Sequence, residues 1–253
     1  MGWFADWRRR RILRDHALDG SLWRRAISPY PFITALNAIE MQSLRDLVVL
    51  FLHEKQLHGA AEFGISDEAR LAIAAQACLP VLNLGLEWYE GWVGVIVYPG
   101  EFKVARTIVD DDGVVHEFDD ELSGEAWPDG PVVLSWQDAS LAEPGYNVVI
   151  HEFAHKIHML RGGDDGFPQP HAGMDVARWE LAFEAAYARF CGAVERGLAT
   201  RMDAYAAENP AEFFAVASET FFTDAAGLNQ EFPAIYRELK AFYRQDPLAR
   251  QPA

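Results

Sequence analysis

The sequence predicts an α+β fold that is mostly helical and contains a small mixed sheet. Apolar residues recur at three- and four-residue steps before residue 80 and again after residue 147, which is typical of helices. Between residues 92 and 136 the pattern changes to short β-branched runs bounded by glycine, proline and aspartate, which is typical of strands. Half of the 253 residues are hydrophobic, so the chain can bury a sizeable core.

Length and composition limit the kind of protein that this chain can be. We expect one compact unit over residues 1–253, with a helical part at 1–90 followed by the sheet and further helices at 91–253. The formal net charge of −16 disfavours a nucleic acid as a direct partner. The longest aliphatic run, residues 47–52, is too short to cross a bilayer. We expect a monomer that does not bind membranes.

The two cysteines, Cys78 and Cys191, lie far apart, and neither belongs to a C-x-x-C pair. This arrangement favours two free thiols over a disulfide or a cysteine zinc site. Free thiols are typical of a reducing compartment, and no apolar segment of a signal peptide follows the basic run at residues 8–11. The sequence therefore predicts a cytoplasmic protein.

The helical part begins with residues 1–30, where tryptophan alternates with arginine. This segment has two interpretations: an arm that docks on an acidic surface or a partner, or a peripheral helix that lays its aromatic rings on the body of the protein. Apolar periodicity then predicts a helix over residues 32–58. A further helix is expected to start at Ser66, a typical N-cap residue, and to end before Pro80.

The sheet is expected between residues 92 and 136. Residues 92–98 form one strand candidate, and residues 102–109 form a hairpin with the strand that follows the Asp-Asp-Asp-Gly turn at 110–113. Residues 131–136 form a further strand candidate. This strand either offers its edge to an extended peptide, which would pair with it backbone to backbone, or is an ordinary strand of the sheet.

A His-Glu-x-x-His motif follows the strands, with His151, Glu152 and His155 as its fixed members. Residues four apart lie on one face of a helix, so the two imidazoles can hold one metal ion. Zinc suits two imidazoles and one carboxylate with a fourth position open to water, and Glu152 can reach such a water without being a ligand. The motif therefore predicts a metalloprotease helix, buried among apolar neighbours and ended by the glycines at 162 and 163.

The loop at residues 161–171 follows the motif directly and is expected to border the site. Its aspartates, Asp164 and Asp165, are either additional metal ligands or part of a solvated loop, and the second interpretation is favoured by the abundance of glycine and proline around them. Helical periodicity resumes over residues 175–197.

The third ligand is expected near residue 210. Asn209 and Pro210 predict a helix start, which places Glu212 at the third helical position. Glu212 is either a capping carboxylate or the third zinc ligand. Glu219, two turns later on the same face, is either the rival ligand or a residue that orients a ligating histidine. Spacing alone does not decide between them, and Tyr205, just upstream, can bring a phenol to the site.

Five segments resemble the Mlc titration factor A family of bacterial zinc peptidases. They are His-Glu-Phe-Ala-His-Lys (151–156), Asp-Ala-Tyr-Ala-Ala (203–207), Asn-Pro-Ala-Glu-Phe-Phe-Ala (209–215), Pro-Val-Val-Leu-Ser-Trp-Gln-Asp (131–138) and Gln-Asp-Pro-Leu (245–248). The catalytic part is also similar to that of anthrax lethal factor, which shares the Tyr-x6-Glu-Phe-Phe spacing. The resemblance covers most of the chain.

The resemblance implies a zincin-like metallopeptidase with one zinc ion per chain. Carried over, the zinc ligands are His151, His155 and Glu212, which selects Glu212 over Glu219. Glu152 is then the general base that acts on a zinc-bound water, and Tyr205 assists by donating a hydrogen bond to the oxyanion. The implied activity is aminopeptidase-like hydrolysis of short peptides, which requires a carboxylate for the substrate's amino terminus.

The same resemblance implies a second function, because the family binds the repressor Mlc and relieves repression. The alternative interpretation is therefore a regulatory protein that sequesters a transcriptional repressor, with peptidase activity secondary. This chain departs from the family at one position: it has His158 where the family is expected to have aspartate. The candidate docking surfaces are residues 1–30 and the aromatic residues of the last helix, Phe232, Tyr236, Phe242 and Tyr243.

Overall fold

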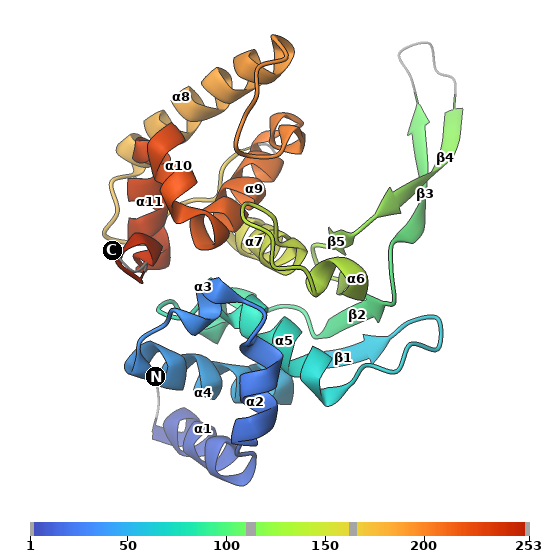
Figure 1. Ribbon diagram of the computed structural model, residues 1–253, viewed down its shortest axis with the longest axis vertical. Helices are drawn as coiled ribbons and strands as arrows, with labels where there is room; N and C mark the ends of the chain where they lie inside the picture. The colour runs from blue at the N-terminus through green and yellow to red at the C-terminus, as the bar shows by residue number, and fades with distance from the viewer. Residues whose placement is uncertain (1–2, 110–114, 162–165, 251–253) are drawn as a thin grey trace.

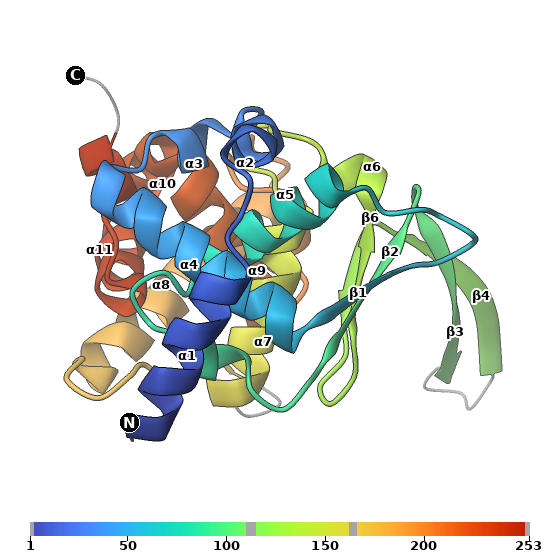
Figure 2. The same ribbon diagram turned by 90° about the horizontal axis from the view of Figure 1, so that it is seen from below.

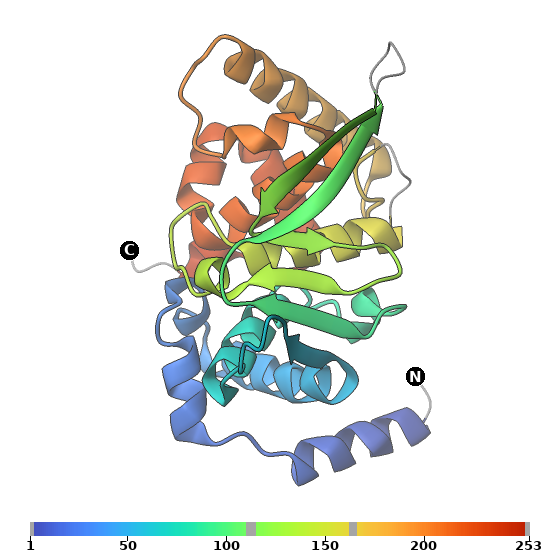
Figure 3. The same ribbon diagram turned by 90° about the vertical axis from the view of Figure 1, so that its right-hand side faces the viewer.

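The computed structural model describes residues 3–109, 115–161 and 166–250, and it has the expected α+β architecture with a small mixed sheet (Figure 1). The helical segments of the first 90 residues lie largely on one side of the sheet (Figure 3). They are α1 (Trp3–Asp15), α2 (Gly20–Ile27), α3 (Pro31–Thr34), α4 (Ala38–Glu54), α5 (Asp67–Cys78) and the short 3₁₀ helix η1 (Leu86–Tyr89).

The helix expected over residues 32–58 is broken twice, so this prediction was wrong in part. Asn37 starts α4 with a capping box: its side chain accepts the N–H of Glu40, and the carboxylate of Glu40 accepts the N–H of Asn37 at 3.1 Å. After α4 the chain becomes a strand, and the N–H of Gln56 donates to the carbonyl of Val93 at 2.8 Å. Pairing with a distant strand therefore overrides the local helical pattern.

Four strands form the mixed sheet, in the order β1 (Gln56–Gly59), β2 (Gly94–Tyr98), β6 (Val132–Ser135) and β5 (Gly124–Ala126). The first three run parallel, and β5 runs antiparallel to β6. Because β6 has a neighbour on both sides, it is an inner strand. Of the two roles left open for residues 131–136, the structure therefore matches the ordinary sheet strand, and that edge of the sheet belongs to β5.

A hairpin of β3 (Phe102–Val109) and β4 (Val115–Leu122) extends away from the body of the protein (Figures 1 and 2). The two strands pair antiparallel, as the sequence predicts. The expected turn at residues 110–113 lies outside the described residues. The chain leaves β4 and enters β5 after a single residue, so the base of the hairpin adjoins the edge of the sheet.

The helices after the sheet pack on the same core as the earlier ones (Figure 1). They are α6 (Trp136–Ala139), α7 (Val148–Arg161), α8 (Val176–Glu195), η2 (Ala204–Ala207), α9 (Pro210–Thr223), α10 (Ala225–Glu231), α11 (Pro233–Tyr243) and η3 (Pro247–Arg250). The helices expected to start at Ser66, near Asp175 and at Asn209 are confirmed, and each of these residues caps its helix with its side chain.

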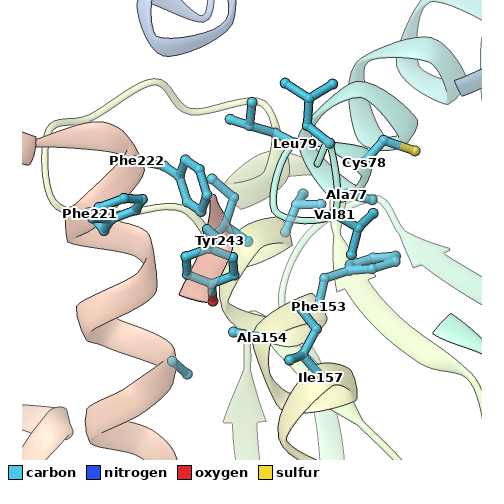
Figure 4. Packing of buried hydrophobic residues seen from close by; sticks show 14 of the residues in the cluster. Ala77, Cys78, Leu79, Val81, Phe153, Ala154, Ile157, Phe221, Phe222 and Tyr243 are labelled. Atoms are coloured by element: carbon cyan, nitrogen blue, oxygen red, sulfur yellow. The ribbon is translucent and has the colours of Figure 1, made fainter. Parts of the chain in front are cut away.

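The hydrophobic core fixes the position of α7. Phe153, Ala154 and Ile157 of this helix are completely buried beside residues of α5 and the carboxyl-terminal helices (Figure 4). The ring of Phe153 contacts Tyr89 and Trp92 with centroid separations of 5.0 and 5.6 Å. Since closely packed rings leave little room for adjustment, the position of α7 is fixed by both halves of the chain.

The two surfaces expected to dock a partner differ in exposure. In the amino-terminal segment Trp23 is buried, whereas Trp7 is about half exposed and lies beside Arg11. In the carboxyl-terminal segment the four aromatic residues that were expected to form a surface are at most 4% exposed, so that prediction is wrong: Phe232, Tyr236, Phe242 and Tyr243. They are core residues because α8 and α9 cover them.

Both cysteines are free thiols, as predicted. Cys78 is completely buried in α5, and burial raises the pKa of its thiol well above the usual range. Cys191 is partly buried in α8.

Within the described part of the chain, none of the helices has both the length and the apolar character that a membrane span requires.

Candidate metal centre

The motif helix α7 brings two histidines to one buried spot. Asn147 caps the helix, since its side-chain oxygen accepts the N–H of Ile150 at 2.8 Å. One turn apart, His151 and His155 are each 9% exposed, and their Nε2 atoms lie 3.0 Å apart. Glu152 between them is also buried. Helical periodicity in the sequence thus brings the two histidines together, and the packing of α7 shields them from bulk water.

The neighbouring helix α9 brings Glu212 to the same spot. Asn209 caps α9 by accepting the N–H of Glu212 at 3.0 Å, which leaves the carboxylate of Glu212 free to turn toward α7. Its Oε2 lies 3.0 Å from Nε2 of His151 and 3.2 Å from Nε2 of His155. The glutamate side chain does not form the capping box that was one of its two expected roles, because its oxygen contacts the imidazoles.

The three atoms fit a zinc ion. Tetrahedral zinc with bonds of about 2.0–2.1 Å holds neighbouring ligand atoms about 3.3 Å apart, close to the separations found here. Among the described residues, His151, His155 and Glu212 are the group of potential ligands whose donor atoms all lie within 4.8 Å of one another. Two imidazoles and one carboxylate form the donor set of a catalytic zinc site.

Glu219 lies behind the cluster instead of in it. Its Oε1 accepts the Nδ1–H of His151 at 2.6 Å, and its Oε2 accepts the backbone N–H of Asn147 at 2.5 Å. A proton held on Nδ1 leaves Nε2 of His151 available to a metal. Of the two roles that spacing left open for Glu219, the geometry matches the one that orients a histidine.

A network of buried side-chain amides holds the start of α7 in place. The side-chain amide of Asn147 donates to Gln76 of α5 at 2.6 Å, and Gln76 in turn donates to the carbonyls of Ala72 and Ala139. Gln76 is completely buried. Because buried amides require partners, the network fixes the start of α7 relative to α5 and α6.

The cluster carries negative potential. Burial alone would lower the pKa of His151, but the carboxylates of Glu219 and Glu212 raise it well above its usual value. Burial alone would raise the pKa of Glu212, but hydrogen bonds from His151 and His155 hold it well below its usual range. The carboxylate of Glu212 therefore keeps its negative charge, which favours a cation at this position.

Glu152 lies under the edge of the sheet. Burial raises the pKa of its carboxyl group to about 8, and the carboxylates of Glu212, Glu219 and Glu125 contribute to the rise. A β-carbon added to Gly124 of β5 would lie 2.5 Å from Oε1 of Glu152 and 2.7 Å from its Cγ. The edge strand therefore passes directly over Glu152, and only glycine allows this approach.

Two cavities meet at the cluster. The first, here called the Tyr146 cavity, has a volume of about 550 Å³ and is lined by Tyr146, Val148, Arg201 and their neighbours. The second, here called the His158 cavity, has a volume of about 540 Å³ and is lined by His158, Glu125 and their neighbours. They share five residues, so together they form one cleft across the site: Leu122, Gly124, His151, Glu152 and Tyr205.

Tyr205 reaches this cleft from η2, which packs against α9. Its ring centroid lies 6.3 Å from that of His151, and the residue is about half exposed. Burial, with a further contribution from the carboxylate of Glu212, raises the pKa of its phenol well above the usual value. Tyr205 therefore keeps its proton and remains a hydrogen-bond donor.

The loop after the motif borders the His158 cavity, as expected. Nε2 of His158 lies 2.7 Å from the carbonyl of Gly166, and both residues line the cavity. Downstream, the N–H of Gln169 donates to the carbonyl of Arg161, which returns the loop to the end of α7. Asp164, Asp165 and the glycines at 162 and 163 lie outside the described residues.

Sequence reasoning missed three residues that shape the site: Gln76, Asn147 and Gly124. A lone glutamine in the alanine-rich apolar helix at 67–78 was a signal of a buried partner, and an asparagine before an apolar run was a signal of an N-cap. Gly124 gave no comparable signal, because β5 has three residues and neither alternating nor continuous apolar character.

A buried helix with two histidines, a glutamate between them and a carboxylate from a neighbouring helix defines a metal centre of the metallopeptidase class. Comparison with known proteins agrees. The chain belongs to the glucose-regulated metallo-peptidase M90 family, whose model matches residues 4–244.

Curated relatives named Mlc titration factor A are similar to this chain along most of its length. Those of Yersinia enterocolitica, Yersinia pestis and Yersinia pseudotuberculosis are each 40% identical over 232 residues. The similarity covers 90% of this chain and 86% of each relative. The resemblance seen in the sequence is thereby confirmed.

The first prediction concerns metal affinity. Replacement Glu212→Ala removes one of three donors and is expected to abolish binding of stoichiometric zinc, measured by elemental analysis after gel filtration. Replacement Glu219→Ala leaves the three donors but releases His151, so affinity should fall roughly 10- to 100-fold in competition with a fluorescent chelator. Glu195→Gln, at an exposed position of α8, is the control. Unchanged affinity in Glu219→Ala would contradict the orienting role.

The second prediction concerns the contact of the edge strand with Glu152. In Gly124→Ala the added methyl group must displace Glu152 or β5, so peptide cleavage should fall by about a hundredfold, while zinc content stays the same. Gly94→Ala in β2 is the matched control, because its β-carbon meets an ordinary contact 3.7 Å from Pro131. Equal activity of the two variants would show that the close approach of β5 to Glu152 does not affect catalysis.

Proposed function

We propose that this protein is a zinc-dependent peptidase that hydrolyses peptide bonds, with an aminopeptidase-like preference for short peptides. The observation that carries the proposal is the convergence of His151, His155 and Glu212 on one point, with Glu152 beside it, where two cavities meet. Membership of a metallopeptidase family supports the reaction class. The two free thiols support a cytoplasmic location.

The proposed mechanism assigns a role to each residue of the cluster. His151, His155 and Glu212 would hold the zinc ion, and the ion would supply a Lewis acid able to polarise the scissile carbonyl and to lower the pKa of a water molecule. Glu152 takes the proton of the attacking water and passes it to the leaving amine. Tyr205 donates a hydrogen bond to the oxyanion of the tetrahedral intermediate.

The edge strand supports a peptide as the substrate. Among the strands of the described residues, β5 pairs with β6 alone, and it contacts α7 beside the metal cluster. An extended peptide can therefore pair with its outer edge, and the peptide would then cross the cleft between the two cavities. Residues 122 and 124, at the start of this edge, line both cavities.

The third prediction tests the reaction. Glu152→Gln removes the base but no metal donor, so kcat for aminoacyl and peptide reporters should fall by about a hundredfold or more, while zinc content stays at that of the wild type. A chelator should abolish cleavage by the wild type, and added zinc should restore it. Retained turnover in Glu152→Gln would rule out the assignment of the base.

A second function, capture of a transcriptional repressor, is favoured by the name of the relatives, Mlc titration factor A. In this hypothesis the protein sequesters a repressor of the Mlc type, and peptidase activity is secondary. The segment with the exposed Trp7 and the arginines of α1 is the candidate surface that remains after the carboxyl-terminal aromatic residues proved to be buried.

The fourth prediction separates capture from catalysis. The immobilised Glu152→Gln protein is mixed with purified Mlc repressor, and binding is measured by surface plasmon resonance. Capture that persists in Glu152→Gln and weakens when the arginines at 8–11 become serine supports the second function. Absence of binding at micromolar repressor would rule it out for this chain.

A further inference from the structure

Lys156 is a buried cation that the metal centre does not use. It follows His155 directly on α7, and it is only 3% exposed. A buried ammonium group is costly unless it is hydrogen-bonded. The ammonium group of Lys156 donates to the carbonyls of Trp127 and Gly130, the latter at 2.9 Å. It also lies 4.9 Å from the centroid of the Trp92 ring. Lys156 therefore connects the metal helix to the turn after β5.

The turn that Lys156 contacts is tight. The N–H of Gly130 donates to the carbonyl of Trp127 at 3.2 Å, which closes a β-turn. A β-carbon added to Gly130 would lie 2.9 Å from Cβ of Trp127, so this turn has no room for a larger residue there. Because Trp127 directly follows Ala126, the last residue of β5, a displacement of the turn also moves that end of the strand.

β5 contacts α7 at both of its ends. At one end Gly124 passes over Glu152. At the other end the chain reaches Lys156, which lies one helical turn after Glu152. The strand therefore lies along the metal helix. Residues from both elements line the His158 cavity, among them Ala126 of β5 and Met159 of α7.

The two ends of β5 differ in their distance from the reacting groups. Glu152, under Gly124, is the proposed base, whereas Trp127 is three residues further along the chain, about 10 Å away in an extended strand. A single aminoacyl residue can occupy the Gly124 end alone. A longer peptide that pairs with the outer edge of β5 extends along the strand toward the end that Lys156 holds.

We propose that Lys156 is a positioning residue for peptide binding: it holds the Trp127 end of β5 against α7 and so sets the width of the His158 cavity, where the part of a peptide beyond the reacting residue binds. The inference rests on the proposed peptidase function, and it names peptides of several residues as the substrate class. Lys156 lines neither cavity, so it acts through the backbone of the turn. A charge-assisted contact with two carbonyls is suited to this role.

The fifth prediction compares substrates of two lengths, a single-residue aminoacyl anilide and a pentapeptide. Lys156→Met keeps an apolar stem but removes the ammonium group, so the turn loses its buried donor. The value of kcat/KM for the pentapeptide should then fall roughly 10-fold further than that for the anilide, mainly through KM. Steady-state kinetics with both substrates measure the difference, and elemental analysis should find the zinc content of the wild type.

Lys55→Met is the matched control. Lys55 is also buried, and it lies 4.2 Å from the centroid of the same Trp92 ring. It also donates to two carbonyls, but these belong to Tyr89 and Trp92, which precede β2. This variant should lower stability without changing the ratio of the two kcat/KM values. Gly130→Ala keeps Lys156 but displaces the turn, so it should change the ratio in the same direction as Lys156→Met.

Three results would overturn the inference. Equal losses for both substrates in Lys156→Met would show that Lys156 serves stability alone. The same change of ratio in Lys55→Met would assign the effect to packing around Trp92. An unchanged ratio in folded Gly130→Ala would show that the turn does not affect binding, and this variant decides the question if Lys156→Met does not fold. If zinc-loaded wild type cleaves neither substrate, the peptidase function itself fails, and the inference falls with it.

Discussion

The buried carboxylate of Glu219 is the interaction on which the centre depends. It joins α9 to α7, because one of its oxygens accepts the backbone N–H of Asn147 at the start of α7 and the other accepts the Nδ1–H of His151. A buried carboxylate is costly unless both oxygens are satisfied, so the contact fixes the distance between α7 and α9. The position of Glu212 relative to the two histidines follows from that distance.

The edge of the sheet is held to the metal helix by a second buried contact. The ammonium group of Lys156, next to His155 on α7, donates to the carbonyls of Trp127 and Gly130 in the turn between β5 and β6. It also lies over the ring of Trp92. The same helix thus carries the histidines on one side and contacts the turn after β5 on another, so α7 positions the edge strand relative to the histidines.

Charge and packing act together in the cleft. Burial removes the water that would screen the carboxylates of Glu212 and Glu219, so a cation is strongly attracted to their neighbourhood. The same burial raises the proton affinity of Glu152.

The sequence by itself determined the elements whose signals are local. Helical spacing paired His151 with His155, and the Asn-Pro start of α9 placed Glu212 at its third position. It did not decide between Glu212 and Glu219, because both lie on one face of α9 and only the packing of α9 against α7 shows which carboxylate lies beside the Nε2 atoms of both histidines. Likewise, β1 and β5 are strands because each pairs with another strand of the sheet. Local sequence patterns do not encode such pairing. Tertiary structure therefore decided the edge of the cleft, the close approach at Gly124 and the burial of the aromatic residues of α11.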